Sequence, residues 1–145
     1  MLGTAAALIF VWLGMVLAIS FLEAPLKFRA PGVTLPIGLG IGRLVFRALN
    51  VAEVALAIGI GVLTAVGGIG TAAGVAVGVA PALLLVQLLL VRPRLSRRTA
   101  QVLAGDDGPR SHAHIAYIVL EVAKVAALIT AGPGAVRLTL GRPPC

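Results

Sequence analysis

Charged residues are scarce in this sequence. Only 12% of its 145 residues are Asp, Glu, Lys or Arg, whereas soluble globular domains carry about 25%. Hydrophobic residues make up 59% of the chain, and its mean hydropathy is +1.08. This composition leaves no room for a separate soluble domain, and it indicates an integral membrane protein.

Cysteine is nearly absent, since Cys145 is the only one. A single cysteine excludes an internal disulfide and a thiol metal cluster. It does not fit the C-a-a-X lipidation pattern either, because it is itself the last residue. The sequence also lacks a nucleophile elbow, a phosphate loop and a thiol pair. We therefore expect no enzyme activity, no cofactor and no metal.

Long apolar runs are what the sequence has instead. A bilayer core of about 30 Å is crossed by about 20 apolar residues in a helix. Four stretches meet this length, at residues 2–22, 44–66, 70–91 and 113–131. The predicted fold class is all-α: a polytopic bundle of four transmembrane helices that forms one domain, 1–145. We expect the first run to be a retained helix, because no Lys or Arg precedes it and it exceeds a typical signal-peptide core.

The basic residues fall between the predicted spans. The net charge is +7, and a basic balance often indicates nucleic-acid binding. Here the positive-inside rule suffices, so no nucleic-acid partner is expected. Segments 23–43 and 92–112 are predicted to be cytoplasmic loops in a bacterial inner membrane, with both termini outside. The second segment could also attract anionic lipid head groups.

Two stretches rich in small residues carry further predictions. Residues 30–42, APGVTLPIGLGIG, contain two prolines and four glycines, which predicts an apolar loop at the membrane surface rather than a helix. Gly70, Gly74 and Gly78 repeat every four residues. That spacing predicts close helix packing, against a helix of the same chain or of a second copy.

Polar residues inside the spans form two stripes. Four on the last span are spaced by 3, 4 and 3 residues, and four on the second by 4, 3 and 3, so each set shares one helix face. The sets are His114, Tyr117, Glu121 and Lys124, and Arg43, Arg47, Asn50 and Glu53.

An unpaired charge in hydrocarbon costs about 2.5–3.5 kcal/mol on insertion scales. The two stripes are therefore expected to face each other. The predicted intramembrane cluster consists of Glu53, Glu121, Lys124 and His114, with Asn50 and Tyr117 as hydrogen-bond partners.

Three roles for this cluster are open. It can be a structural network in which Lys124 neutralises Glu121 or Glu53. It can instead serve transport, because two carboxylates with one lysine leave an excess carboxylate to carry a proton or a cation. A metal or cofactor site would use His112 and His114 with Glu121, but the two histidines point about 200° apart on a helix.

Several motifs resemble a known family. WLGMVLAISFLEAPLKFRAPG (12–32), GRLVFRALNVAEVALAI (42–58) and SHAHIAYIVLEV (111–122) are similar to segments of small bacterial four-span proteins related to the transmembrane protein 205 group. Glu23 and the Pro/Gly-rich linker depart from the family pattern. The resemblance implies a four-helix membrane protein with no assigned reaction, and it supplies no catalytic residue.

The expected function is that of a non-enzymatic integral membrane protein. An accessory or assembly subunit of a larger membrane complex is favoured, because four helices enclose little room for a substrate. The alternative is a small ion, proton or solute transporter that uses the Glu/Lys/His cluster. The expected partners are the lipid bilayer, other membrane subunits or a second copy, and anionic lipids.

Overall fold

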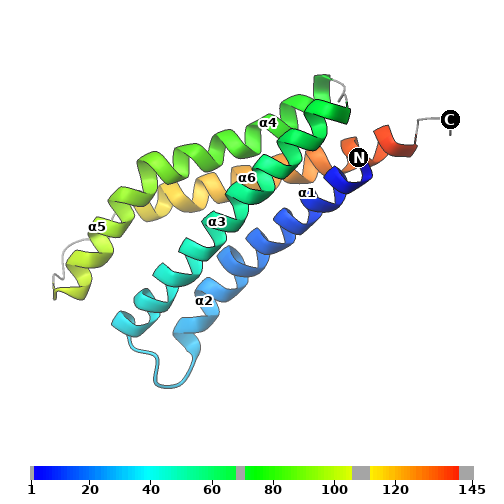
Figure 1. Ribbon diagram of the computed structural model, residues 1–145. Helices are drawn as coiled ribbons and strands as arrows, with labels where there is room; N and C mark the ends of the chain where they lie inside the picture. The colour runs from blue at the N-terminus through cyan, green and yellow to red at the C-terminus, as the bar shows by residue number, and fades with distance from the viewer. Residues whose placement is uncertain (1, 68–70, 106–111, 141–145) are drawn as a thin grey trace.

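The chain forms a bundle of four long helical segments (Figure 1). The computed structural model describes residues 2–67, 71–105 and 112–140; within these ranges the side chains of residues 71–73, 76, 113, 114, 138 and 139 are not described. No strand occurs in the described part of the chain. The predicted all-α four-helix bundle is confirmed.

Each long segment is built from one or more consecutive helices. The first joins α1 (Leu2–Val16), the π-helical η1 (Leu17–Glu23), α2 (Ala24–Leu26) and the 3-10 turn η2 (Lys27–Arg29). The second is α3 (Leu35–Gly67). The third joins α4 (Thr71–Val86), the π-helical η3 (Gln87–Val91) and α5 (Arg92–Leu103). The fourth is α6 (His112–Leu140).

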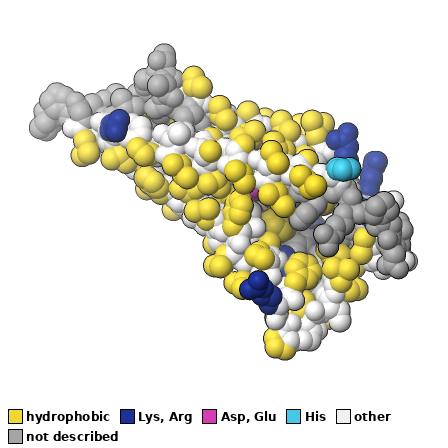
Figure 2. All heavy atoms as spheres, turned by 180° about the vertical axis from the view of Figure 1, so that it is seen from behind, with side chains coloured by type: hydrophobic (Ala, Val, Ile, Leu, Met, Phe, Trp, Pro, Cys, Tyr) yellow, Lys and Arg dark blue, Asp and Glu magenta, His cyan; other side chains and the backbone are white. Residues whose placement is uncertain are grey.

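All four segments are long and apolar enough to cross a membrane. The candidate spans are Leu2–Arg29, Leu35–Gly67, Val77–Leu103 and Ile115–Arg137. Figure 2 shows hydrophobic side chains over most of the visible flank of the bundle. Leu44, Ile58, Val75 and Leu89 are among the exposed large apolar residues. Such a flank suits hydrocarbon rather than water.

The prediction of a loop at residues 30–42 is wrong from Leu35 onward, because α3 begins there. Pro36 lies in the first turn of the helix, where its missing N–H would have no intrahelical acceptor. Gly38 and Gly42 are buried. A Cβ at Gly38 would overlap the Phe28 ring. These glycines permit close packing inside a helix rather than marking a break.

The predicted loops 23–43 and 92–112 also contain more helix than expected. The first span continues through η2 to Arg29, and α5 occupies Arg92–Leu103. Pro93 lies at the start of α5, where proline is tolerated. The many polar residues of 92–112 are compatible with a helix, because Arg94 and Arg97 are exposed on α5. The backbone N–H and C=O groups inside this helix pair with each other.

One apolar stripe on each segment builds the core. On α1 the buried residues lie three or four positions apart, except for the neighbours Ala5 and Ala6, which places them on one face. The core cluster consists of Ala6, Ile9, Trp12, Val16, Ile60, Ala80, Leu84, Ala127, Leu128, Ala131 and Ala135. The alanines come mainly from α6. Small side chains there let the α6 backbone approach its neighbours closely.

The basic segments lie at one end of the bundle. Figure 1 places α2, the connection to α3, and α5 at the end opposite to the start of α1 and the last turns of α6. The two segments predicted to share one side of the membrane therefore share one end of the fold.

Candidate functional site: a buried ion-pair cluster beside a basic cavity

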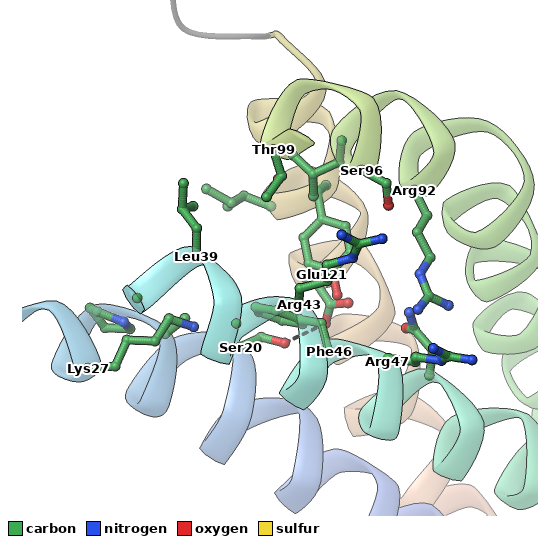
Figure 3. A pocket seen from close by; sticks show the side chains of 18 of the residues that line it. Ser20, Lys27, Leu39, Arg43, Phe46, Arg47, Arg92, Ser96, Thr99 and Glu121 are labelled. Atoms are coloured by element: carbon green, nitrogen blue, oxygen red, sulfur yellow. Dashed lines mark hydrogen bonds between the residues drawn. The ribbon is translucent and has the colours of Figure 1, made fainter. Parts of the chain in front are cut away.

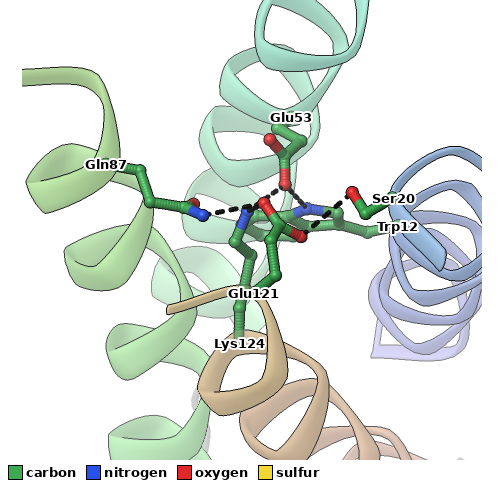
Figure 4. A network of polar contacts seen from close by, with 6 residues as sticks. All are labelled: Trp12, Ser20, Glu53, Gln87, Glu121 and Lys124. Atoms are coloured by element: carbon green, nitrogen blue, oxygen red, sulfur yellow. Dashed lines mark hydrogen bonds and ion pairs between the residues drawn. The ribbon is translucent and has the colours of Figure 1, made fainter. Parts of the chain in front are cut away.

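Lys124 joins two carboxylates in the middle of the bundle. Its Nζ lies 2.5 Å from Glu53 Oε1 and 3.0 Å from Glu121 Oε1. The side chains of Lys124 and Glu53 are 0% exposed, and that of Glu121 is 2% exposed. Figure 4 shows the three side chains converging from two helices. The sequence proposed either acid as the partner of Lys124, and the structure assigns both.

The contact between Glu53 and Lys124 spans the bundle. Both α1 and α4 pack against α3 and against α6, so α3 and α6 lie across the bundle from each other. The predicted stripes on these two helices therefore do face each other. Burial removes all three groups from water, and this is tolerated because each charge has an opposite charge within contact distance.

Three further side chains bind the carboxylates. Trp12 Nε1 donates to Glu53 Oε1 at 2.9 Å. Gln87 Nε2 donates to Glu121 Oε1 at 2.8 Å, and Ser20 Oγ donates to Glu121 Oε2 at 3.3 Å. Each of the four long segments thus contributes to one polar network (Figure 4).

Sequence reasoning did not assign these donors to the cluster. Trp12, Ser20 and Gln87 lie on the first and third segments, outside the two polar stripes that the sequence predicts. Ser20 and Gln87 both lie in π-helical segments, η1 and η3. A π-helical turn shifts the faces on which later side chains lie and is frequent at functional sites. No pattern of period 3.6 anticipates that shift.

The predicted hydrogen-bonding roles of Asn50 and Tyr117 are not found. Both side chains are buried, at 4% and 8% exposure. Asn50 Oδ1 and Tyr117 OH have no hydrogen-bond partner among the described residues. Tyr117 instead packs edge-on against Phe46, with ring centroids 5.5 Å apart. A place on the correct helix face does not by itself bring a side chain within hydrogen-bond distance of a carboxylate, since Glu53 Oε2 also lacks a partner among the described residues.

Some of the remaining predicted site residues lie outside the described part of the structure. The His114 side chain lies outside the described residues, and His112 is exposed. Across the described ranges, no three His, Cys, Asp or Glu side chains are grouped as metal ligands would be. Gly70 also lies outside the described residues. Gly78 is exposed, and a Cβ there would meet no atom within 4 Å.

A cavity of about 660 Å³ adjoins the cluster at the basic end of the bundle. Residues from η1, α2, η2, α3, α5 and α6 line it. Glu121 is at once a lining residue and a member of the ion-pair cluster. Figure 3 shows its carboxylate in the same space as the arginine side chains and bound to Ser20. The cluster is therefore adjacent to a space large enough for a small molecule.

Positive charge dominates the lining of this cavity. Among the described residues, four cationic side chains line it, from Lys27, Arg43, Arg47 and Arg92, and one acidic side chain, from Glu121. Asn50 and Tyr117 also line it, and the apolar walls include Phe21, Phe28, Leu39, Phe46, Leu95 and Ile118.

Comparisons with known proteins give no match to a family model, to a curated protein or to a solved structure. The similarity to the transmembrane protein 205 group stays a prediction based on short motifs. Functional inference for this chain thus depends on the geometry of the cluster and the cavity.

Proposed function

We propose that this protein is a small membrane transporter in which the cluster of Glu53, Glu121 and Lys124 carries a proton. The observation that supports this most directly is the double position of Glu121, which lines the cavity and contacts Lys124. A carboxylate in that position can take a proton from the cavity and share it with Glu53 through the same lysine. Acids inside membrane spans frequently mark such paths.

Charge balance favours a proton as the carried species. Two carboxylates and one ammonium leave one negative charge in excess, and Glu53 Oε2 has no hydrogen-bond partner among the described residues. One bound proton removes the excess and with it the cost of an uncompensated buried charge.

The proposal includes an orientation. The basic end of the bundle faces the cytoplasm of a bacterial inner membrane, and both termini lie outside, in accord with the positive-inside rule. The cavity then opens toward the cytoplasm. A C-terminal fusion to a protein that fluoresces only in the cytoplasm should stay dark, and a bright fusion would reverse the assignment.

Proton flux into proteoliposomes tests the transport role. Purified protein is reconstituted with an internal pH-sensitive dye, and a potassium diffusion potential drives proton entry. We expect faster acidification than in protein-free vesicles, and loss of that excess in Glu121→Gln and Glu53→Gln. Neutralisation leaves no ionisable carboxylate to exchange at that position, while the amide keeps the shape of the side chain.

Glu23→Gln is the matched control. Glu23 is also a carboxylate in the first span, but its partner is Lys27 at 3.3 Å and its side chain is 30% exposed. This variant should retain the flux of the unmodified protein. Helix content and elution volume verify that all three variants fold. Flux that is equal in folded Glu121→Gln and in the unmodified protein would contradict the proposal.

A second candidate is the role of an accessory subunit in a larger membrane complex. The open surface over Gly78 favours it, because α4 packs within the chain through Ala80 and Leu84 and leaves the glycine outward. Mass spectrometry after purification in native nanodiscs should then find a stoichiometric partner. Gly78→Val should lose that partner, whereas Gly61→Val, at a similarly open glycine on α3, should keep it. Retention of the partner by Gly78→Val would exclude this surface.

A further inference from the structure

We infer that the cavity binds an amphiphilic anion, a molecule with a phosphate or carboxylate head and an aliphatic chain. This inference goes beyond the proposed proton pathway and does not depend on it, because it concerns occupancy of the cavity rather than flux. It also differs from attraction of lipids to a basic surface, since it assigns an enclosed site with two chemically distinct parts.

The three arginines of the cavity have no acidic partner in the part of the chain that the structure describes. Across residues 2–67, 71–105 and 112–140, Arg43, Arg47 and Arg92 have no acidic side chain within ion-pair distance. The oxygens of Glu121 are already engaged, Oε1 by Gln87 and Lys124 and Oε2 by Ser20. Figure 3 shows the three arginine side chains entering one space from α3 and α5. Converging guanidinium groups bind phosphate and carboxylate through paired N–H donors.

Lys27 adds a fourth basic side chain to the cavity lining, from η2. Its side chain is only 9% exposed, and its Nζ lies over the rings of Phe46 at 5.3 Å and Phe28 at 5.6 Å from the centroids. Glu23 at 3.3 Å balances this charge. A lysine held between aromatic rings is a fixed boundary between the charged and the apolar parts of the cavity.

Two buried polar groups also await a partner. Tyr117 OH and Asn50 Oδ1 are buried, line the cavity and lack a hydrogen-bond partner among the described residues. Buried polar groups are rarely left unpaired in proteins. A phosphate or carboxylate oxygen in the cavity would accept the Tyr117 O–H. Asn50 Oδ1 is itself an acceptor and cannot pair with an anionic oxygen, so Tyr117 OH is the buried group that favours an anionic head over a plain hydrocarbon.

The rest of the wall fits an aliphatic chain. Phe21, Leu39, Leu95 and Ile118 line the cavity, and its volume of about 660 Å³ lies within the range of small-molecule sites, about 300–1,000 Å³. Inorganic phosphate would fill only a small part of this space. A ligand with both an anionic head and a chain satisfies the guanidinium groups and the apolar wall together.

Protection of an introduced cysteine measures occupancy. Ser96→Cys places a thiol on the cavity wall, and Cys145→Ser removes the native one. Full-length protein in phosphatidylcholine nanodiscs is labelled with a maleimide while dodecyl phosphate, dodecylphosphocholine or inorganic phosphate is added. We expect dodecyl phosphate to slow labelling at concentrations at which the other two do not. Equal protection by dodecylphosphocholine or by inorganic phosphate would overturn the inference, since charge or chain would then be irrelevant.

The arginine variants make the assay specific to the site. Arg92→Gln should raise the half-protecting concentration of dodecyl phosphate roughly tenfold, the loss that one charge-assisted hydrogen bond typically represents. Arg94→Gln is the control, because Arg94 belongs to the same helix, is exposed and does not line the cavity. An equal effect of the two changes would show nonspecific attraction and would refute the assignment.

A second labelling experiment distinguishes a membrane lipid from a free amphiphile as the ligand. Nanodiscs that contain phosphatidylglycerol, with no added amphiphile, test whether a bilayer lipid reaches the site. Slow labelling there, reversed by Arg92→Gln, identifies a membrane lipid as the occupant. Fast labelling there, together with protection by dodecyl phosphate, identifies a free single-chain amphiphile. No protection in either arm would overturn the proposed site.

Discussion

Replacement of Lys124 by alanine is expected to cost about 3–5 kcal/mol in the free energy of unfolding, the range found when one member of a buried ion pair is removed. The change leaves Glu53 and Glu121 as two buried carboxylates without their shared cation. Repulsion between them adds to the lost attraction. Equilibrium unfolding in mixed micelles, followed by helix content, measures the effect.

The double variant Lys124→Ala with Glu53→Gln should be more stable than Lys124→Ala alone, because it removes one of the two stranded charges and the repulsion between them. Lys27→Ala serves as the control, since its i, i+4 partner Glu23 is 30% exposed and can be hydrated once the lysine is removed, so this change should cost less than Lys124→Ala. If the double variant loses as much as the sum of the two single changes, the two residues are not energetically coupled.

Replacement of Trp12 by alanine should cost a further large amount, about 3–5 kcal/mol, as for other buried Trp or Phe truncations. Trp12 is 1% exposed and is the largest side chain buried in the bundle. In lipid, helices are held together mainly by close packing, so the cavity left by the indole removes dispersion contacts that nothing replaces. The same unfolding assay in mixed micelles reports the loss.

Trp12→Phe separates packing from hydrogen bonding. The ring of phenylalanine fills most of the space, but it cannot donate to Glu53 Oε1, which Trp12 Nε1 contacts at 2.9 Å. We expect a loss of about 1–2 kcal/mol, because Glu53 keeps its contact with Lys124. A cost for Trp12→Phe as large as that for Trp12→Ala would mean that the hydrogen bond, not packing, is the main contribution.

From Leu35 onward, the loop prediction at residues 30–42 failed for a physical reason. Proline disrupts a helix because it has no backbone N–H to donate. Glycine disrupts a helix because it loses more conformational entropy on folding than other residues do. Pro36 avoids the first cost through its place in the opening turn, and Gly38 and Gly42 gain close contact with Phe28 and Lys27. Composition alone does not reveal either compensation, since both depend on what lies opposite.

The polar cluster was predicted in part. Glu53, Glu121 and Lys124 were identified because charge is expensive in hydrocarbon and must pair, and period 3.6 placed them on facing stripes. Asn50 and Tyr117 share those stripes, yet their side-chain oxygens are unpaired. Membership in a stripe fixes the direction of a side chain within about a quarter turn, which is too coarse to select among neighbouring donors.

Sequence by itself determined the number of spans, the end at which the basic residues gather and the acids that a lysine must neutralise. These follow from hydropathy, from helix periodicity and from the cost of buried charge, which act locally along one chain. Only the tertiary structure decided that Trp12, Ser20 and Gln87 reach the carboxylates and that arginines from α3 and α5 share one cavity. Those contacts depend on the rotation of each helix and on two π-helical segments, which packing sets for all four segments at once.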